Sequence, residues 1–292
     1  MQSIQTVSEN TIYVGASDRR LAKFENLFPI PRGVSYNAYV ILDEKTALLD
    51  TADASVGAQF LENVAAALDG RKLDYLIVDH MEPDHAAMIE AVLVRWPDLR
   101  LVVNAKTLPM LKMYFPTDSA AIDDALVVKE GDTLDLGKHK LTFVMAPMVH
   151  WPEVMMTFDT TTGTLFSADA FGTFGALEGA LFADEVDFAG KWLDDARRYY
   201  TNIVGKYGPQ VQALLKKAAA LDIKTICPLH GPVLTGDLSK YLNYYDLWSS
   251  YKAEEPEKIL VASASIHGHT RAAAHTMAEK LRAQGAKVVE MD

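Results

Sequence analysis

The sequence contains a single cysteine, Cys227, among 292 residues, so no disulfide can form within the chain. Disulfides are typical of secreted proteins, and their absence favours a cytoplasmic enzyme. The first ten residues have neither the basic nor the apolar stretch of a signal peptide. No apolar run approaches the ~20 residues needed to cross a bilayer. We therefore expect no membrane partner.

Positive charge is also scarce. The chain has 28 Lys and Arg against 39 Asp and Glu, which gives a formal net charge of −11. Binding to a phosphate backbone requires basic surface, so we expect no nucleic-acid partner. Apolar residues, in contrast, make up 49% of the chain, which is enough for a large buried core.

Short apolar runs alternate along the chain with helix-like segments. The hydrophobic pattern predicts strands at 37–43, 46–50, 74–79, 99–104, 141–147, 154–159, 164–168 and 224–228. It predicts helices at 54–68, 85–95, 106–114, 187–205, 209–221 and 237–252. This order suits an α/β fold in which two sheets pack face to face with helices outside, a four-layer αββα sandwich.

The segment 253–257 is polar and contains a proline, which predicts a linker between a domain at 1–252 and a segment at 258–292. The second segment reads as strand, helix and strand. Hydroxyls and a glycine before its helix suit a phosphate site, although an ordinary strand-turn-helix fits the loop equally well. Two strands and one helix cannot form an independent core, so 258–292 is expected to be the start of a domain.

The most informative motif is His80-Met-Glu-Pro-Asp-His85, which follows the apolar run 75–78. Three further residues of metal-ligand type, each after its own apolar run, are His150, Asp169 and His230. Ligand sites in open α/β sheets lie outside the carboxyl ends of strands, so these four loops could converge on one edge. Seven ligands from four strand ends suit two metal ions.

Pro83 divides the ligands of this motif. Proline fixes its own φ and keeps Glu82 out of the helical region, so the turn should present side chains to both sides. Such a turn could give one metal His80 and Glu82 and the other Asp84 and His85, with His150 and His230 completing one metal each and Asp169 bridging both. The three carboxylates favour a hard ion, and no thiolate is near. Iron is the first choice, with manganese or zinc as alternatives.

The motifs His80-x-Glu82-x-Asp84-His85, His150-Trp-Pro-Glu, Ser-Ala-Asp169-Ala-Phe-Gly and Pro-Leu-His230-Gly-Pro resemble those of the flavodiiron proteins at all seven ligand positions. The resemblance covers a metallo-β-lactamase-like domain that ends near residue 252. Residues 258–292 resemble the start of the flavodoxin-like domain that binds FMN. The positions that match the phosphate loop of that domain are Ser265, His267, Gly268, His269 and Thr270, although Asn is usual where His269 stands.

This resemblance implies a centre of two iron ions that reduces O2 to water, NO to N2O, or both. One iron would be held by His80, Glu82 and His150, the other by Asp84, His85 and His230, with Asp169 bridging. It also implies a head-to-tail homodimer, or a dimer of dimers, in which the FMN of one subunit serves the irons of the other. The electron donor would be a rubredoxin-like protein or a flavin reductase. The phosphate loop alone should not retain FMN in these 292 residues.

Two other functions stay open. One is a binuclear hydrolase that cleaves a thioester or phosphodiester with a metal-bound hydroxide. Glu82 and the flavodoxin-like segment count against it. The other is a di-iron sensor that binds O2 or NO without fast turnover.

Several neighbouring residues allow more than one interpretation. Asp50 could support the ligand turn or simply end a strand. Trp151 could line a substrate pocket, or it could pack on the sheet. Cys227 is expected to be a small buried filler, and His139 is expected in an exposed turn with no functional role.

Overall fold

The computed structural model describes residues 3–116 and 119–292. These residues form two compact units, one that extends to Ser250 and one from Tyr251 to Asp292. The change from one unit to the other lies just before the linker expected at 253–257.

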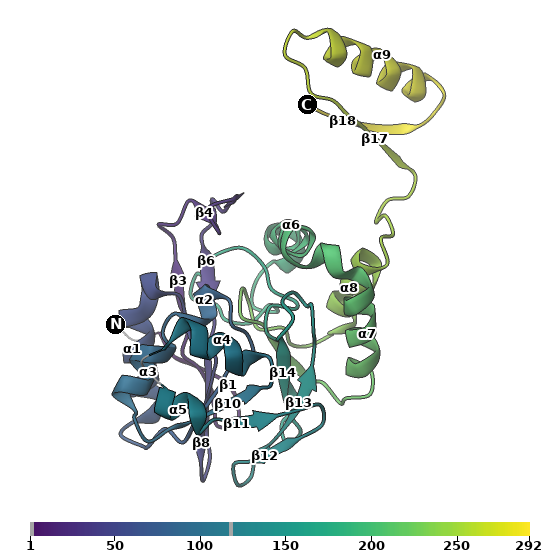
Figure 1. Cartoon of the computed structure of the whole chain (residues 1–292). Coiled ribbons are helices and arrows are strands. Elements are labelled where there is room, and N and C mark those ends of the chain that lie inside the picture. The colour runs from purple at the N-terminus through teal and green to yellow at the C-terminus, as the bar shows by residue number, and fades with distance from the viewer. Residues whose placement is uncertain (1–2, 117–118) are drawn as a thin grey trace. The chain divides into compact units, whose positions relative to one another are not determined.

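The first unit contains a seven-stranded sheet (Figure 1). Its strands, in spatial order, are β1 (Gln5–Ser8), β2 (Thr11–Tyr13), β7 (Tyr39–Leu42), β8 (Thr46–Leu49), β9 (Tyr75–Ile77), β10 (Arg100–Asn104) and β11 (Leu126–Val128). Strands β8 to β11 are parallel, so their carboxyl ends share one edge. β8 is buried along its whole length, as expected for an apolar run covered on both faces.

The same unit contains a second, five-stranded sheet. Its strands, in spatial order, are β12 (Thr133–Asp135), β13 (Lys140–Met145), β14 (Met155–Asp159), β15 (Thr164–Phe166) and β16 (Thr225–Cys227). Tyr39 and Ile77 of the first sheet share one buried cluster with Phe143 and Phe166 of the second. The two sheets therefore pack face to face. Cys227 is buried in this cluster, which confirms its expected role as a filler.

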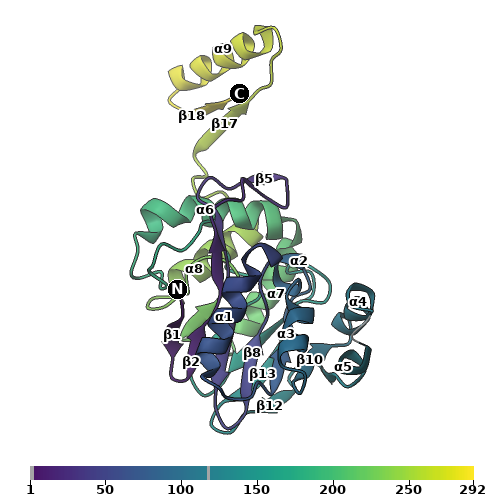
Figure 2. The ribbon, with the colours of Figure 1, turned by 90° about the vertical axis from the view of Figure 1, so that its left-hand side faces the viewer.

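Helices cover the outer faces of both sheets. On the first sheet lie α1 (Gly57–Leu68), α3 (Ile89–Arg95), α4 (Thr107–Tyr114) and α5 (Ser119–Asp123) (Figure 2). On the second lie α6 (Leu193–Tyr199), α7 (Gly208–Ala218) and α8 (Ser239–Ser249). Leu165 packs in the cluster that includes Val211 of α7, while its neighbour Phe166 faces the other sheet, as alternation along a strand requires. The predicted αββα sandwich is confirmed.

The predicted strands are all present, but two predicted helices were wrong in detail. The segment 85–95 is divided into α2 (Pro83–Ala86) and α3, because the chain turns at residues 87–88. The segment 187–205 contains two π-helical turns, η2 (Phe188–Trp192) and η3 (Tyr200–Val204), on either side of α6, and ends in the 3₁₀ turn η4 (Gly205–Tyr207). Helix 54–68 begins as the 3₁₀ turn η1 (Ala54–Val56), capped by the Asp53 side chain.

Short strands near the N-terminus were not predicted. Besides β1 and β2 they are β3 (Ala16–Asp18), β4 (Lys23–Phe24), β5 (Phe28–Pro29) and β6 (Val34–Tyr36). β3 pairs with β6, and β4 with β5, in two antiparallel ribbons. These strands are defined by their pairing with other segments and not by a local hydrophobic pattern, so they could not be read from the sequence.

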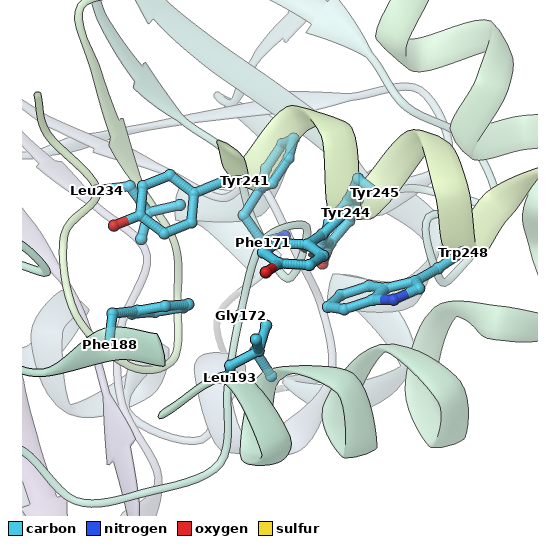
Figure 3. A pocket seen from close by; sticks show the side chains of 10 residues that line it. Phe171, Gly172, Phe188, Leu193, Leu234, Tyr241, Tyr244, Tyr245 and Trp248 are labelled. Carbon is cyan, nitrogen blue, oxygen red and sulfur yellow. Dashed lines mark hydrogen bonds between the residues drawn. The ribbon is translucent and has the colours of Figure 1, made fainter. Parts of the chain in front are cut away.

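An aromatic cluster fills the space between α6 and α8 (Figure 3). Phe171 stacks on Tyr245 with ring centroids 4.1 Å apart, and Phe188 meets Tyr241 edge to face at 4.9 Å. The cavity left among these rings measures about 20 Å³. Such a cavity holds roughly one water molecule, so it is a packing feature of the helical layer.

His139 is not in an exposed turn, so that prediction was wrong. The side chain is fully buried, and its Nδ1 lies 2.8 Å from Oδ2 of Asp159. The backbone N–H of His139 also donates to Asp43. The contact with Asp159 satisfies the imidazole and so allows it to be buried. Asp159 is twenty residues away in sequence, so the local sequence around His139 did not reveal it.

The second unit is a βαβ element. Its parallel strands β17 (Lys258–Ala262) and β18 (Lys287–Met291) are joined by α9 (His269–Ala283). The predicted strand-helix-strand order is thus observed. Among residues 3–116 and 119–292, no helix combines the length and the apolar character required to span a membrane.

Candidate metal centre

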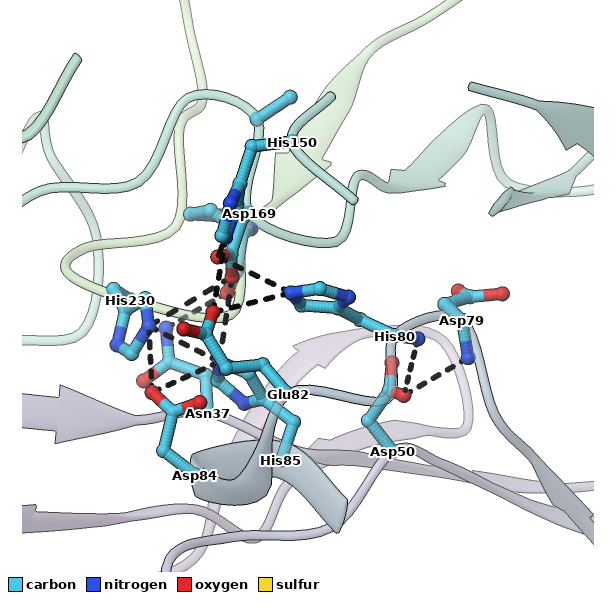
Figure 4. A network of polar contacts seen from close by, with 12 residues as sticks. Asn37, Asp50, Asp79, His80, Glu82, Asp84, His85, His150, Asp169 and His230 are labelled. Atoms are coloured by element: carbon cyan, nitrogen blue, oxygen red, sulfur yellow. Dashed lines mark hydrogen bonds and ion pairs between the residues drawn. The ribbon is translucent and has the colours of Figure 1, made fainter. Parts of the chain in front are cut away.

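The structure brings all seven predicted ligands together at one end of the sandwich (Figure 4). Each of them is buried, and they come from loops that follow β9, β13, β15 and β16. The loops belong to both sheets, so the site exists only because the sheets pack face to face. The residues are His80, Glu82, Asp84, His85, His150, Asp169 and His230.

The turn between β9 and α2 has the expected conformation. Glu82 is extended, with φ −59° and ψ 141°, and Pro83 takes the first position of α2. Asp84 and His85 therefore lie on the first helical turn, while His80 and Glu82 precede it. This change of conformation directs the ligands into two groups.

The first group contains His80, Glu82, His150 and Asp169. Oε2 of Glu82 lies 3.2 Å from Nε2 of His80 and 2.9 Å from Nε2 of His150. Nε2 of His150 is also 3.0 Å from Oδ2 of Asp169. Two imidazoles and two carboxylates thus point at one small volume.

The second group contains Asp84, His85 and His230. The Nε2 atoms of the two histidines face one another at 3.0 Å. Oδ2 of Asp84 lies 3.4 Å from Nε2 of His85 and 3.3 Å from Nε2 of His230. Two imidazole nitrogens and one carboxylate oxygen therefore lie close together and face one small volume.

Asp169 contacts both groups through different oxygens. Oδ2 faces His150, and it lies 3.6 Å from Nε2 of His80. Oδ1 lies 3.3 Å from Nε2 of His85 and 3.7 Å from Nε2 of His230. The carboxylate stands between the groups, as a bridging ligand must.

The spacing and chemistry of these atoms fit two cations. Bonds of ~2.0–2.2 Å to a metal place neighbouring ligand atoms ~3.0–3.5 Å apart, which matches most of the separations above. Within the described part of the chain, neither carboxylate oxygen of Asp84 has a hydrogen-bond partner, and neither does Oδ1 of Asp169. Buried carboxylate oxygens without a donor are costly, and a metal ion would satisfy them.

The electrostatics of the two ligand groups also favour cations. Burial opposes charge on His150, but hydrogen bonds with Asp169 and Glu82 outweigh it and raise the pKa of His150 to about 9. Burial alone would raise the pKa of Asp169, yet the charge of His80 and the hydrogen bond with His150 hold it well below its ordinary value. Protons on the imidazoles stand where metals would bind, and metal loading should release them.

Residues outside the ligands hold the site in place. Asp50, anticipated as a possible support, accepts hydrogen bonds from the backbone N–H of Asp79 at 2.9 Å and of His80 at 3.2 Å. Burial raises the pKa of Asp50 to about 6. Trp151 meets the ring of His80 edge to face at 5.5 Å, so it packs against the ligands.

Two supporting residues were missed in the sequence. Glu153 accepts from Nδ1 of His80 at 2.9 Å, and Asn37 holds the loop that carries His230. The Glu in His150-Trp-Pro-Glu was a visible signal for the first, because a carboxylate close to a ligand often orients an imidazole. No comparable sequence signal pointed to Asn37.

A cavity of about 370 Å³ lies beside the centre. Its wall includes Glu82 and Asp84 together with residues of the β4–β5 ribbon, among them Phe24 and Glu25. A hydrogen bond with Glu82, reinforced by partial burial, raises the pKa of Glu25 to about 8. The location of this ribbon at the site could not be predicted, because its strands were not recognised in the sequence.

The predicted phosphate-loop residues lie between β17 and α9 in the second unit. Gly268 precedes the first residue of α9 with a φ of 81°, a left-handed conformation that glycine adopts readily. The positions expected to contact FMN are exposed or half-buried, and they are Ser265, His267, Gly268, His269 and Thr270.

The chain is similar to a family model, to curated proteins and to solved structures. Residues 34–231 match a family model described as ODP family beta lactamase. The nitric oxide reductase of Moorella thermoacetica is 33% identical over 286 residues, which cover 97% of this chain and 70% of that protein. The chain spans about half the length of several other curated relatives that it matches.

Two solved structures superpose closely on the chain. The flavodiiron protein from Giardia intestinalis has a TM-score of 0.92 at 27% identity, and the match covers 100% of this chain and 70% of that one. The rubredoxin oxygen:oxidoreductase from Desulfovibrio gigas has a TM-score of 0.91 at 29% identity, with coverage of 99% and 71%.

Proposed function

The chain belongs to the ODP family of beta-lactamase-like proteins, and from this premise we propose that it is a non-haem di-iron oxidoreductase. Its reaction would be the reduction of O2 to water, of NO to N2O, or of both. When bound, two iron ions would supply the redox chemistry. The proposed ligands are His80, Glu82 and His150 for one ion, Asp84, His85 and His230 for the other, and Asp169 for both.

The position of Asp169 is the observation that carries this proposal. Its two oxygens face two different groups of imidazoles and carboxylates, so one buried side chain can serve two cations. Three carboxylates around two metal positions supply more hard oxygen ligands than a zinc site requires. This ligand set supports iron.

The cavity beside the centre supports an uncharged substrate. Besides the ligands Glu82 and Asp84, its wall contains one acid and one base, Asp53 and Lys23, and it contains Glu25, whose pKa of about 8 keeps it largely uncharged at neutral pH. A wall without a surplus of cations offers little attraction to an anion such as a phosphodiester, and it imposes little electrostatic cost on O2 or NO. The cavity therefore favours gas reduction over phosphodiester hydrolysis.

Electron supply belongs to the same proposal. In a protein that contains a whole flavodoxin-like domain, we expect FMN to bind through the loop that includes Ser265, Gly268 and Thr270. The FMN of one subunit would serve the metal centre of another in a head-to-tail homodimer. A rubredoxin-like protein or a flavin reductase would reduce the FMN. The single buried cysteine supports a cytoplasmic location for these steps.

Metal analysis tests the proposal directly. Protein isolated from iron-replete cells should contain about two irons per chain and show absorption from ferric-carboxylate centres. With a reduced small-molecule donor it should consume O2 or NO catalytically. Two zinc ions per chain together with esterase or phosphodiesterase turnover would identify a hydrolase. Two irons that bind O2 or NO without turnover, even with an artificial donor, would identify a sensor.

A further inference from the structure

We infer that Glu153 and Asn37 are two separate positioning residues, each dedicated to one half of the metal centre. Glu153 would hold the position that contains His80, and Asn37 the position that contains His230. The inference rests on the proposed binding of two metals. It adds that each metal position has its own supporting network, so that each can be weakened alone.

Glu153 acts on His80 through the nitrogen that faces away from the ligand group. Its Oε1 lies 2.9 Å from Nδ1 of His80 and accepts the backbone N–H of Met81, also at 2.9 Å. The carboxylate fixes the proton on Nδ1, which leaves Nε2 free to coordinate and makes it more basic. Glu153 is itself 1% exposed, and Asn104 donates a hydrogen bond to its backbone oxygen.

Asn37 acts on the second position through the backbone. Its side-chain Nδ2 donates to the carbonyls of Pro228 and Gly231, both at 2.8 Å, so one amide spans the loop on either side of His230. Nδ1 of His230 lies 2.7 Å from the carbonyl oxygen of Ser35, two residues before Asn37. The short segment from Ser35 to Asn37 therefore fixes both the loop and the ring.

The two networks are independent in structure and in charge. Glu153 lies just before β14 of the second sheet, and Asn37 lies between β6 and β7. Within residues 3–116 and 119–292, Glu153 forms no hydrogen bond with the second ligand group, and Asn37 forms none with the first. The first network adds a negative charge beside its metal position, whereas the second consists of neutral groups.

Asp159 provides a matched control. It pairs with Nδ1 of His139 at 2.8 Å, and both side chains are fully buried, so the chemistry resembles that of Glu153 and His80. The pair lies at the opposite end of the β13–β14 hairpin from His150. Six residues of β13 separate the two ends, which corresponds to roughly 20 Å. Asp159 does not contact the metal centre, so a substitution of Asp159 shows how a general loss of stability alone affects metal binding.

The experiment compares Glu153→Gln, Asn37→Ala and Asp159→Asn in the full 292-residue chain. Each protein is loaded with iron, dialysed against a weak chelator, and analysed for iron per chain. Anomalous diffraction at the iron edge then locates the retained ions. We expect a ~10–100-fold loss of affinity at one position in each of the first two variants. Glu153→Gln should empty the His80 position, Asn37→Ala the His230 position, and Asp159→Asn neither.

Milder substitutions cover the case in which a variant does not fold. Ser35→Ala removes the hydroxyl that accepts the N–H of Gly231 at 2.7 Å, and it should weaken the His230 position alone. Glu153→Asp keeps the charge but shortens the side chain, and it should weaken the His80 position alone. Loss of both irons together, loss at the opposite position, no loss at all, or equal loss in Asp159→Asn would each overturn the inference. A parent protein that does not hold two irons would instead overturn the proposed function.

Discussion

Asp169 and Asp50 are both buried carboxylates beside the same histidines, but only Asp169 faces two ligand groups. Replacement of Asp169 by alanine should remove a ligand from each metal and leave the repulsion between the metals less screened. We expect Asp169→Ala to lose much of its metal, as measured by elemental analysis. Asp50→Ala should lower metal affinity or activity ~10–100-fold, because Asp50 acts through the backbone of the ligand turn. Equal metal retention in Asp169→Ala and the parent would refute the bridging role.

The raised pKa of His150 predicts that the stability of the metal-free protein falls as the pH rises. The pKa of His150 is raised from 6.5 to about 9 in the folded state, so protonation stabilises the fold. This contribution is complete below pH 6.5 and is lost as the pH rises through about 9. The Tm of the metal-free protein should therefore fall between pH 6.5 and 9. His150→Gln should make the fall smaller, and a Tm that rises across this window would contradict the assignment.

The affinity of the protein for metal should depend on pH in the opposite direction and should fall as the pH falls. Metals bind neutral imidazole, so protons compete with them as the pH falls. Loading the apoprotein at pH 7 should release protons, which calorimetry in buffers of different ionisation enthalpy can count. Proton-independent loading would mean that the histidines are already neutral.

At the residue scale, the sequence was sufficient to predict which seven side chains gather at one site, but of the residues that hold them in place it indicated only Asp50. His80, His150 and His230 could be identified because each follows an apolar run that is a buried strand. Glu153 and Asn37 matter only through the atoms that the folded chain brings next to them. Their roles arise from pairing between distant segments, which a single sequence does not show.

At the scale of elements, the loop after β16 depends on Gly231. This residue has a φ of +79°, and an added Cβ would lie 2.0 Å from Cγ2 of Thr173. Gly70 has a similar φ of +80° with no atom within 4 Å, so it is a matched control for the backbone strain alone. We expect Gly70→Ala to cost ~1–2 kcal/mol. Gly231→Ala should cost ~1–3 kcal/mol more, because the methyl group meets a buried side chain.

Urea unfolding of the metal-free proteins measures this difference. Gly231→Ala should also lose metal from the His230 position, since the glycine adjoins that ligand, whereas Gly70→Ala should retain both metals. Equal destabilisation by the two substitutions would show that the loop can move away from Thr173.

The same scale explains which elements could be predicted. Unbroken apolar runs such as 75–78 at β9 and 143–145 at β13 are largely buried, and their pattern alone identifies them. The N-terminal ribbons are stabilised by pairing, and the π-helical turns around α6 pack against α8 through aromatic side chains. Pairing and packing are tertiary effects, so local sequence did not predict these elements. The missed β4–β5 ribbon is also the one that supplies Glu25 to the cavity.

At the scale of the whole molecule, the two units differ in how many of their apolar side chains are buried. In the first unit, buried apolar side chains fill the space between the two sheets and also the space between the sheets and the helices that cover them. In the second unit, Ala278 alone among the described residues 251–292 is buried. Large apolar side chains remain exposed there, including Leu260 at 58% and Ile266 at 95%. A polypeptide of these 292 residues therefore presents a βαβ element without a closed core.

This difference predicts the cofactor content of a polypeptide of residues 1–292. FMN requires a phosphate loop and also a surface that grips its ring, and in flavodoxin-like sheets ring contacts come from loops at the ends of further strands. Residues 258–292 provide only the loop before α9, which is exposed. We expect purified protein to be loaded with metal but to hold no stoichiometric FMN, as judged by its visible spectrum. Its turnover should be limited by electron delivery and should increase with a small-molecule donor. A yellow, FMN-loaded preparation would show that the βαβ element binds the ring unaided.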